Sequence, residues 1–149
     1  MKMLQKICFV LLLMTTFSSV YGGECAKDNK VDDWCRVKAE QGNAVVQTVL
    51  GHAYKDGDGV LQNYKEALKW YRKAAEQGHS SAQSHLGYMY YKGQGVLQDY
   101  VMAHMYWNIA AVDGRKSAVR GRGIVEKKMT ASQIEKARNL AREWMQKHQ

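Results

Sequence analysis

The first stretch that could do chemistry is the acidic turn KDGDG at residues 55–59. Closely spaced aspartates with glycine are typical of calcium loops, because Ca²⁺ prefers carboxylate oxygens and the loop must bend sharply. An EF-hand loop starting at Asp56 would need an oxygen ligand and then glycine where the chain has Val60 and Leu61. A second copy of the turn, GQG at residues 93–95, carries no acid. We therefore expect no metal site.

Catalytic motifs are also missing from the sequence. The chain contains no G-x-S-x-G, H-E-x-x-H or Walker A pattern, and neither the S-x-x-K nor the K-T-G of penicillin-recognising enzymes. The histidines show no spacing typical of a catalytic set; they are His52, His79, His85, His104 and His148. We expect no catalytic residue and no cofactor, and we expect the histidines to be packing or surface groups.

The chain contains three cysteines, which could form a disulfide or bind zinc. Cys8 lies in the leader segment described below, so Cys25 and Cys35 are the two that we expect in the mature chain. Two cysteines in an exported protein most often form a disulfide, and their spacing is not the C-x-x-C of a redox pair. Without a matching set of histidines they do not make a zinc site. We predict a structural Cys25–Cys35 disulfide near the N-terminus, with a redox pair as the alternative.

The first 22 residues have the layout of a secretory signal peptide. A basic start, MKMLQK, precedes the apolar run ICFVLLLM, which is far shorter than the roughly 20 residues of a membrane-spanning helix. Val20 and Gly22 are small enough for the positions before a cleavage point, and Glu24 before Cys25 argues against a lipid-attachment site. We predict cleavage after Gly22 and export to the periplasm, the cell surface or the medium. An uncleaved anchor is the alternative.

Charge is distributed unevenly along the chain. Residues 23–113 carry 10 basic and 11 acidic residues, whereas residues 114–149 carry 10 basic and 3 acidic residues. A cationic patch of this kind suits an acidic protein, anionic lipid or another polyanion. An exported protein rarely meets nucleic acid, so we expect no nucleic-acid partner. The alternative is that these basic residues form an ordinary solvated helix face.

The sequence contains a repeat of 36 residues, and this repeat indicates the helices that carry the residues described above. Gly42, Gly78 and Gly114 end the similar strings VKAEQG, KAAEQG and AAVDG. A helix-like stretch follows each glycine, and in the first two copies a G-x-G-V turn and a second helical stretch come next. Self-similarity at a period of about 20–50 residues with two helices per unit indicates an α-solenoid.

We therefore predict an all-α fold, a right-handed α-solenoid of seven stacked helices that ends in a capping helix. The mature chain is expected to be a single domain, residues 23–149, with a half-repeat at 28–42, repeats at about 43–78 and 79–114, and a degenerate repeat with the cap at 115–149. Thr130 with Gln133 three residues later is a capping-box signature before an amphipathic run, which indicates the last helix. We expect the protein to be a monomer.

The repeat resembles a known family. The string A-E-Q-G-x-x-x-A-Q-x-x-L-G-x-x-Y-x-x-G-x-G-V-x-x-D-Y-x-x-A is similar to the Sel-one-like repeat (SLR), a relative of the tetratricopeptide repeat. Residues 75–103 match it almost throughout, and residues 39–67 match with Val46 and Asn63 in place of the usual alanine and aspartate. The third unit departs from the pattern, because VRGRGIVEKK lacks the G-x-G-V turn and is basic.

The resemblance implies a curved scaffold that binds other proteins, often exported and often at a host or envelope interface. It carries over no catalytic residue, so the expected function is an exported, non-enzymatic module for protein–protein interaction. Some cysteine-rich relatives have been described as penicillin-binding or β-lactamase-like. An envelope hydrolase that acts on β-lactam or peptidoglycan-like substrates is therefore the alternative.

In such stacks the first helix of each unit lines the concave side. Its apolar stripe is buried, so the polar stripe opposite is expected to face a groove that holds a protein or peptide ligand. The expected partner-binding residues on this stripe are Thr48, His52, Ser84, His85, Tyr88, Lys92, Arg120 and Arg122. Tyrosine and arginine are common binding anchors. The alternative is that these are ordinary exposed polar residues.

Overall fold

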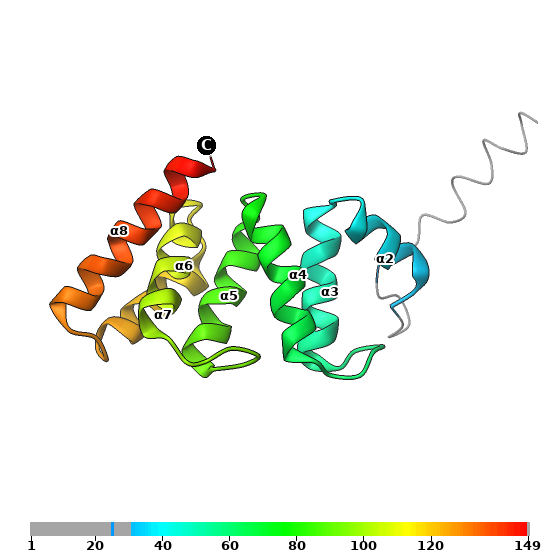
Figure 1. The fold of residues 1–149 in the computed structure, drawn as a ribbon, viewed down its shortest axis with the longest axis horizontal. Coiled ribbons are helices and arrows are strands. Elements are labelled where there is room, and N and C mark those ends of the chain that lie inside the picture. Colours follow the sequence, from blue (N-terminus) through cyan, green and yellow to red (C-terminus); the bar gives the residue numbers. More distant parts are fainter. Residues whose placement is uncertain (1–24, 26–30, 149) are drawn as a thin grey trace, which may run out of the picture.

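The computed structural model describes Cys25 and residues 31–148, and it places seven helices and no strand in them. The helices stack in chain order along the long axis of the molecule (Figure 1). They are α2 (Asp33–Glu40), α3 (Ala44–Asp56), α4 (Tyr64–Glu76), α5 (Ser80–Lys92), α6 (Tyr100–Val112), α7 (Lys116–Glu126) and α8 (Ala131–Lys147). The predicted all-α stack is confirmed. The predicted signal peptide, residues 1–22, lies outside the described residues.

The 36-residue period of the sequence is also the period of the helices. The first helices of the units, α3, α5 and α7, begin at Ala44, Ser80 and Lys116, and the second helices α4 and α6 begin at Tyr64 and Tyr100. Each first helix packs on its second helix, and each second helix packs on the first helix of the next unit. The core therefore runs through the whole stack.

Glycine turns join the two helices within each of the first two units. Gly57 ends α3 and Gly93 ends α5, both in the left-handed conformation with φ of 79° and 69°. Glycine adopts this conformation without the steric penalty that a Cβ brings. After the turn, the side chains of Asn63 and Asp99 accept hydrogen bonds from the first backbone amides of α4 and α6. The turn and the cap together set the angle at which the second helix returns.

A close approach between helices occurs at the same place in both units. A Cβ added at Gly51 of α3 would lie 2.4 Å from the ring of Tyr71 in α4, and one added at Gly87 of α5 would lie 2.7 Å from the ring of Trp107 in α6. Gly121 of α7 approaches Trp107 as well, at 2.5 Å for the added Cβ. The missing side chains let the aromatic rings lie directly against the helix backbones.

Buried glutamines connect successive units. Gln47 and Gln83, both almost fully buried, donate from their side-chain amides to the carbonyl oxygens of Ala39 and Ala75 at 2.8 and 3.3 Å. Those carbonyls belong to the last turns of the preceding helices, which lack intrahelical partners. The glutamine at this repeat position thus fixes the first helix of one unit to the end of the unit before it.

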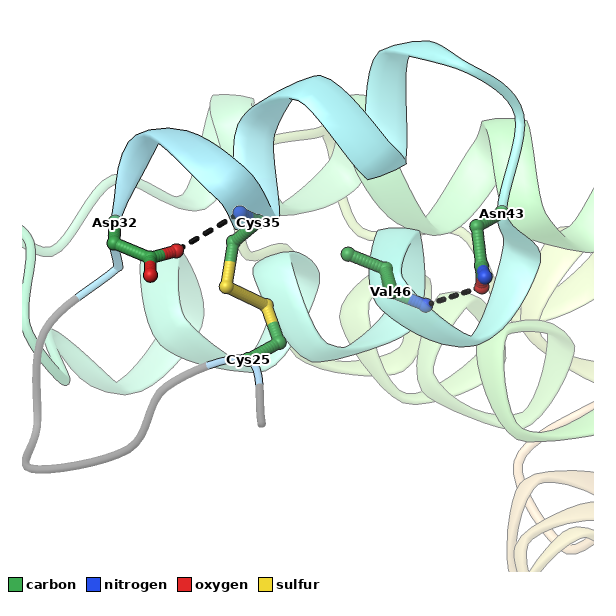
Figure 2. Close-up of a disulfide and its surroundings, with 5 residues drawn as sticks. All are labelled: Cys25, Asp32, Cys35, Asn43 and Val46. Carbon is green, nitrogen blue, oxygen red and sulfur yellow. Dashed lines mark hydrogen bonds between the residues drawn. A yellow bond between two sulfur atoms is a disulfide. The ribbon is translucent and has the colours of Figure 1, made fainter. Parts of the chain in front are cut away.

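The N-terminal helix α2 is a half-repeat that packs on α3. The carboxylate of Asp32 caps it by accepting from the Cys35 amide at 2.9 Å, as Figure 2 shows. Cys35 is fully buried, and the structure joins it to Cys25 in a disulfide whose Cα atoms are 5.3 Å apart. The bridge therefore ties Cys25 to the first layer of the core.

The C-terminal helix α8 closes the stack. Thr130 and Gln133 form a capping box, in which each side chain accepts from the backbone amide of the other, so this prediction is confirmed. Ala137 and Ala141 are fully buried, and Ala141 packs with Met105 and Ile109 of α6. The opposite face of α8 is charged and exposed, as expected for a cap.

The glycine–aromatic contact predicts a stability effect at Gly87. In Gly87→Ala, the new methyl group would overlap the Trp107 ring, and overpacking of this kind costs about 1–3 kcal/mol of unfolding free energy. Gly123→Ala is the matched control, because an added Cβ there meets nothing within 4 Å. The control should be neutral or stabilising by up to about 1 kcal/mol, owing to the higher helix propensity of alanine. Urea denaturation of both variants checks this, and equal stabilities would contradict the contact.

Candidate functional site

A groove of about 610 Å³ lies between α5 and α7, over the ring of Trp107 from α6. Trp107 is 5% exposed and donates from its indole nitrogen to the carbonyl oxygen of Ser84 at 3.0 Å, which fixes the ring in place. Gly121 lets α7 approach the other side of this ring. The base of the groove is therefore a rigid aromatic surface.

The two walls of the groove carry large side chains that face solvent. Tyr88 of α5 is 40% exposed and Ile124 of α7 is 51% exposed. These two residues occupy the same repeat position, 36 residues apart. Tyr91 of α5 also lines the groove. An aromatic and an aliphatic side chain thus lie on opposite walls and offer apolar area to a ligand.

The charged residues that line the groove are all basic: Lys55, Lys92, Arg115 and Arg120. Lys55, at the end of α3, pairs with the carboxylate of its neighbour Asp56 at 2.6 Å. The ammonium of Lys92 lies 5.4 Å from the centre of the Tyr91 ring and 5.9 Å from that of Tyr88. Such distances allow weak cation–π attraction. The groove is therefore electropositive and partly aromatic.

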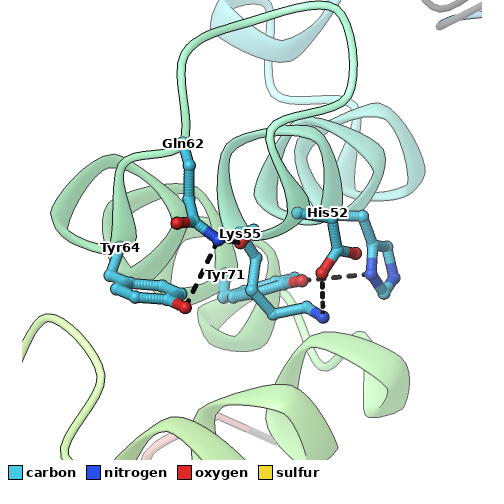
Figure 3. A network of polar contacts seen from close by, with 6 residues as sticks. His52, Lys55, Gln62, Tyr64 and Tyr71 are labelled. Carbon is cyan, nitrogen blue, oxygen red and sulfur yellow. Dashed lines mark hydrogen bonds and ion pairs between the residues drawn. The ribbon is translucent and has the colours of Figure 1, made fainter.

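Two histidines and a tyrosine form a compact cluster at the α3 side of the groove. The ring of His52 lies 4.2 Å from that of His85, and the ring of His85 stacks on Tyr71 with centroids 5.1 Å apart. The Tyr71 hydroxyl and His52 Nδ1 are 3.1 Å apart, as Figure 3 shows beside Lys55. This cluster forms the contact between the first helices of successive units.

Burial keeps both histidines of the cluster neutral. Burial, together with repulsion from His52, Lys55 and Arg115, lowers the pKa of His85 to about 4. Burial and Lys55 also lower the pKa of His52 below its usual value. Burial raises the pKa of the Tyr71 hydroxyl, so that group stays protonated. At neutral pH the cluster therefore adds no positive charge to the groove.

Five of the eight expected partner-binding residues line this groove: Ser84, His85, Tyr88, Lys92 and Arg120. Ser84 is only 8% exposed, because its hydroxyl lies 3.2 Å from that of Ser117 in α7. It therefore joins two units more than it faces solvent. His52 does not border the groove and contacts it only through His85.

Thr48 and Arg122 do not line this groove. Thr48 is 4% exposed, and its hydroxyl lies 2.8 Å from His79 Nδ1 at the start of α5, so it is covered by the next unit. Arg122 points toward α6 and donates to the side-chain oxygen of Asn108 at 2.8 Å. Arg120 and Arg122 are two positions apart in the sequence, and on a helix that spacing places side chains on different faces.

Seven further residues line the groove and lie outside the expected set of eight: Lys55, Tyr91, Trp107, Arg115, Ser117, Gly121 and Ile124. Arg115 occupies the N-cap of α7, where the first unit has Asn43, and its side chain makes no capping hydrogen bond. A cation at a helix N-terminus opposes the helix dipole. The arginine at this N-cap position was therefore a signal in the sequence that could have indicated a functional residue. Trp107 stands at the repeat position of the buried Tyr71, and its sequence context resembles that of a core residue.

A second hollow of about 700 Å³ lies between α6 and α8. Its lining mixes charges, since Glu135 accompanies Arg138 and Arg142. Arg138 also lies 3.7 Å from Glu126, which is 2.8 Å from the buried His104. The positive charge is therefore largely balanced here, in contrast to the groove between α5 and α7.

Metal-binding and membrane-spanning features can be assessed for Cys25 and residues 31–148. In this part of the chain, no group of three or more histidine, cysteine, aspartate or glutamate side chains is placed to hold a metal ion. None of the helices described there has the length and apolar character needed to cross a membrane.

The pattern of the Sel1 repeat family matches three stretches of the chain, residues 44–79, 80–111 and 131–147. These stretches contain the turns, the capping residues Asn63 and Asp99, and the first two glycine–aromatic contacts described above. No curated protein matches the chain significantly.

Solved structures give two informative matches. A protective antigen present in uropathogenic Escherichia coli strains, which displays an SLR fold, is 38% identical with a TM-score of 0.79; the match covers 87% of this chain and 28% of the antigen. A Sel1 repeat protein from Oxalobacter formigenes is 41% identical with a TM-score of 0.58, covering 61% of this chain and 37% of that protein. The chain therefore spans well under half the length of either protein.

The histidine cluster predicts a loss of stability in acid. The pKa of His85 is about 4 in the folded protein and about 6.5 in an unfolded chain, so the unfolded state binds more protons between these values. The free energy of unfolding should fall as pH drops from about 6.5 to 4, and His85 should account for at most about 3 kcal/mol of the decrease. His52 and His79, whose pKa values burial also lowers, should act in the same direction.

His85→Gln should reduce this pH dependence, whatever its own effect on stability at pH 7. Urea denaturation at pH 7.5 and pH 4.5 gives the change in the free energy of unfolding with pH for each protein. His148→Gln, at the exposed C-terminal end, serves as the control. If wild type, His85→Gln and His148→Gln all lose the same free energy between these pH values, His85 is not neutral for the reason given.

Proposed function

The chain belongs to the Sel1 repeat family, and from that premise we propose that it is an exported scaffold that binds a protein ligand in the groove between α5 and α7. Sel1 repeat proteins are in general non-catalytic scaffolds for protein–protein interaction, and the solved structures similar to this chain are repeat proteins. We propose, in addition, that the ligand is a protein and that it binds in this particular groove.

The observation that supports the groove most is the pairing of exposed apolar walls with a rigid base. Tyr88 and Ile124 face solvent across the fixed ring of Trp107. Binding sites draw most of their affinity from a few aromatic, aliphatic or arginine anchors on a preorganised surface. The packed stack supplies that preorganisation, because each wall is a helix held by its neighbours.

The basic C-terminal end supports an acidic partner that reaches beyond the groove. Residues 114–149 carry 10 basic and 3 acidic residues, and most of the basic side chains on α7 and α8 are exposed. Complementary charge at the rim of an interface mainly raises the association rate. We infer that this end steers an acidic protein toward the groove as a complex with a single copy of the chain.

Export of the protein is the second part of the proposal. Its support is the basic and apolar pattern of residues 1–22, together with the similarity to a protein described as a protective antigen. Periplasm, cell surface and medium are all consistent with these observations. A disulfide between Cys25 and Cys35 fits an oxidising compartment.

The mass of the protein recovered from outside the cytoplasm tests export and the disulfide together. Mass spectrometry without reduction should show a chain that begins at residue 23 and is two hydrogen masses lighter than the fully reduced form, because Cys25 and Cys35 are joined. Breaking the bridge should lower the free energy of unfolding by about 2–3 kcal/mol. An uncleaved chain would contradict export by a cleaved signal, and two free thiols in the exported protein would contradict the bridge.

Truncation of Tyr88 tests the position of the binding site. Tyr88→Ala removes an exposed ring, so the free energy of unfolding should change by less than about 1 kcal/mol. Affinity for a partner captured by crosslinking in the native envelope should fall by about 2 kcal/mol, or about thirtyfold. Leu61→Ala, which truncates a 91% exposed side chain in the α3–α4 turn, is the matched control and should bind normally. Normal binding by Tyr88→Ala, or loss only through unfolding, would place the site elsewhere.

A further inference from the structure

We propose that the groove between α5 and α7 recognises an acidic peptide segment, with one apolar side chain held between Tyr88 and Ile124 and carboxylates on both sides of it. This inference rests on the proposed function and specifies the chemistry of the ligand. Its occupant is a segment of another protein, and charge complementarity is the main argument for it.

Three of the four basic residues that line the groove have no acidic partner among the described residues. Within the described part of the chain, no carboxylate forms an ion pair with Lys92, Arg115 or Arg120. Arg115 makes only long contacts, 3.3 and 3.4 Å, to the hydroxyl of Ser80. Three cations that face one groove repel each other, and a ligand carboxylate among them would relieve that repulsion.

These charges are not required by the repeat itself. At the positions 36 residues earlier, Lys92 corresponds to Asp56, Arg120 to Ser84 and Arg115 to His79. At each of the three positions, the preceding unit thus builds the corresponding helix without the cation. The replacements concentrate positive charge at the junction of α5 and α7, where the groove lies between two first helices.

Arg115 supplies an independent argument, because its position is unfavourable for folding. The N-cap of a helix favours Asn, Asp, Ser or Thr, and the positive end of the helix dipole repels a cation. Asn43 makes the capping hydrogen bond in the first unit at 3.0 Å, whereas His79 and Arg115 make none at the same position of the next two units, and only Arg115 places a permanent cation there. Arg115 thus departs from the residue types that favour a helix N-cap, and it lines a groove. Departures of this kind are expected at functional sites.

The space between Tyr88 and Ile124 over Trp107 is an apolar seat, and it determines which acidic ligand fits. Tyr88 and Ile124 lie on opposite walls over Trp107, so a ligand side chain between them would contact apolar atoms on three sides. Lys92 beside Tyr88 and Arg120 on the Ile124 helix then flank that seat with positive charge. A polyanion without an apolar group would satisfy the cations and leave the seat empty.

The test is fluorescence anisotropy of the full chain with a short labelled peptide that has one central phenylalanine between pairs of glutamates. Two matched peptides replace either every glutamate with glutamine or the phenylalanine with serine. The acidic peptide should bind at least about tenfold more tightly than either matched peptide, and added salt should weaken its binding. Inorganic polyphosphate and vesicles containing anionic lipid should bind more weakly and without dependence on Tyr88.

Charge-reversal variants assign the binding to the groove. Arg120→Glu and Lys92→Glu should each weaken the acidic peptide by about tenfold or more. Arg122→Glu has the same charge change two residues from Arg120 but faces Asn108, and Lys136→Glu lies on the exposed face of α8, so both should bind within about twofold of wild type. Melting temperatures measured alongside identify any variant that loses binding by unfolding.

Equal binding of the glutamate and glutamine peptides, or equal losses in Arg120→Glu and Arg122→Glu, would overturn the acidic-peptide inference. So would polyphosphate or anionic vesicles that bind more tightly than the peptide. The proposed function can survive each of these results. If Tyr88→Ala still weakens the captured partner while the acidic peptide fails to bind, the groove is the site and only its preference for acidic ligands is wrong.

Discussion

The ring of Trp107 lies against Gly87 of α5 on one side and Gly121 of α7 on the other, and the rest of the candidate site depends on this contact. Glycine at both positions lets the two first helices approach the same aromatic side chain. The thickness of the Trp107 side chain between them therefore sets the spacing of α5 and α7. That spacing in turn sets the width of the groove between Tyr88 and Ile124. One core residue therefore holds a repeat together and also forms the base of the binding surface.

Polar side chains on the first helices are divided between two tasks. Thr48 and Ser84 occupy the same repeat position, and each contacts the start of the next unit, at His79 and Ser117 respectively. They are buried because the stack covers them. The residues one turn further along, such as Tyr88 and Lys92, are beyond the reach of the next unit and face solvent. Stacking thus uses one end of the polar stripe and leaves the other for a ligand.

Much of the fold could be predicted because residues within the repeat mark where each helix begins and ends. The recurring glycines, the capping residues and the Thr130–Gln133 signature are local signals, and local signals survive in any tertiary context. The site was harder, since the burial of Thr48 depends on where the next unit begins, and the direction of Arg122 depends on Asn108 of another helix. Such contacts are long-range, so the sequence of one helix does not reveal them. Arg115 was visible only as a departure from the usual N-cap chemistry.

The central proposal is that a partner occupies the groove between α5 and α7. The most direct measurement is site-specific photo-crosslinking in the native envelope, with a benzophenone amino acid placed at Ile124 in one protein and at Leu97 in another. Both side chains are exposed, at 51% and 91%, but only Ile124 lines the groove. We expect a discrete partner adduct from position 124 and none of that mass from position 97. An adduct from position 97 alone would show that the partner binds the turns at the edge of the stack, and would contradict the account.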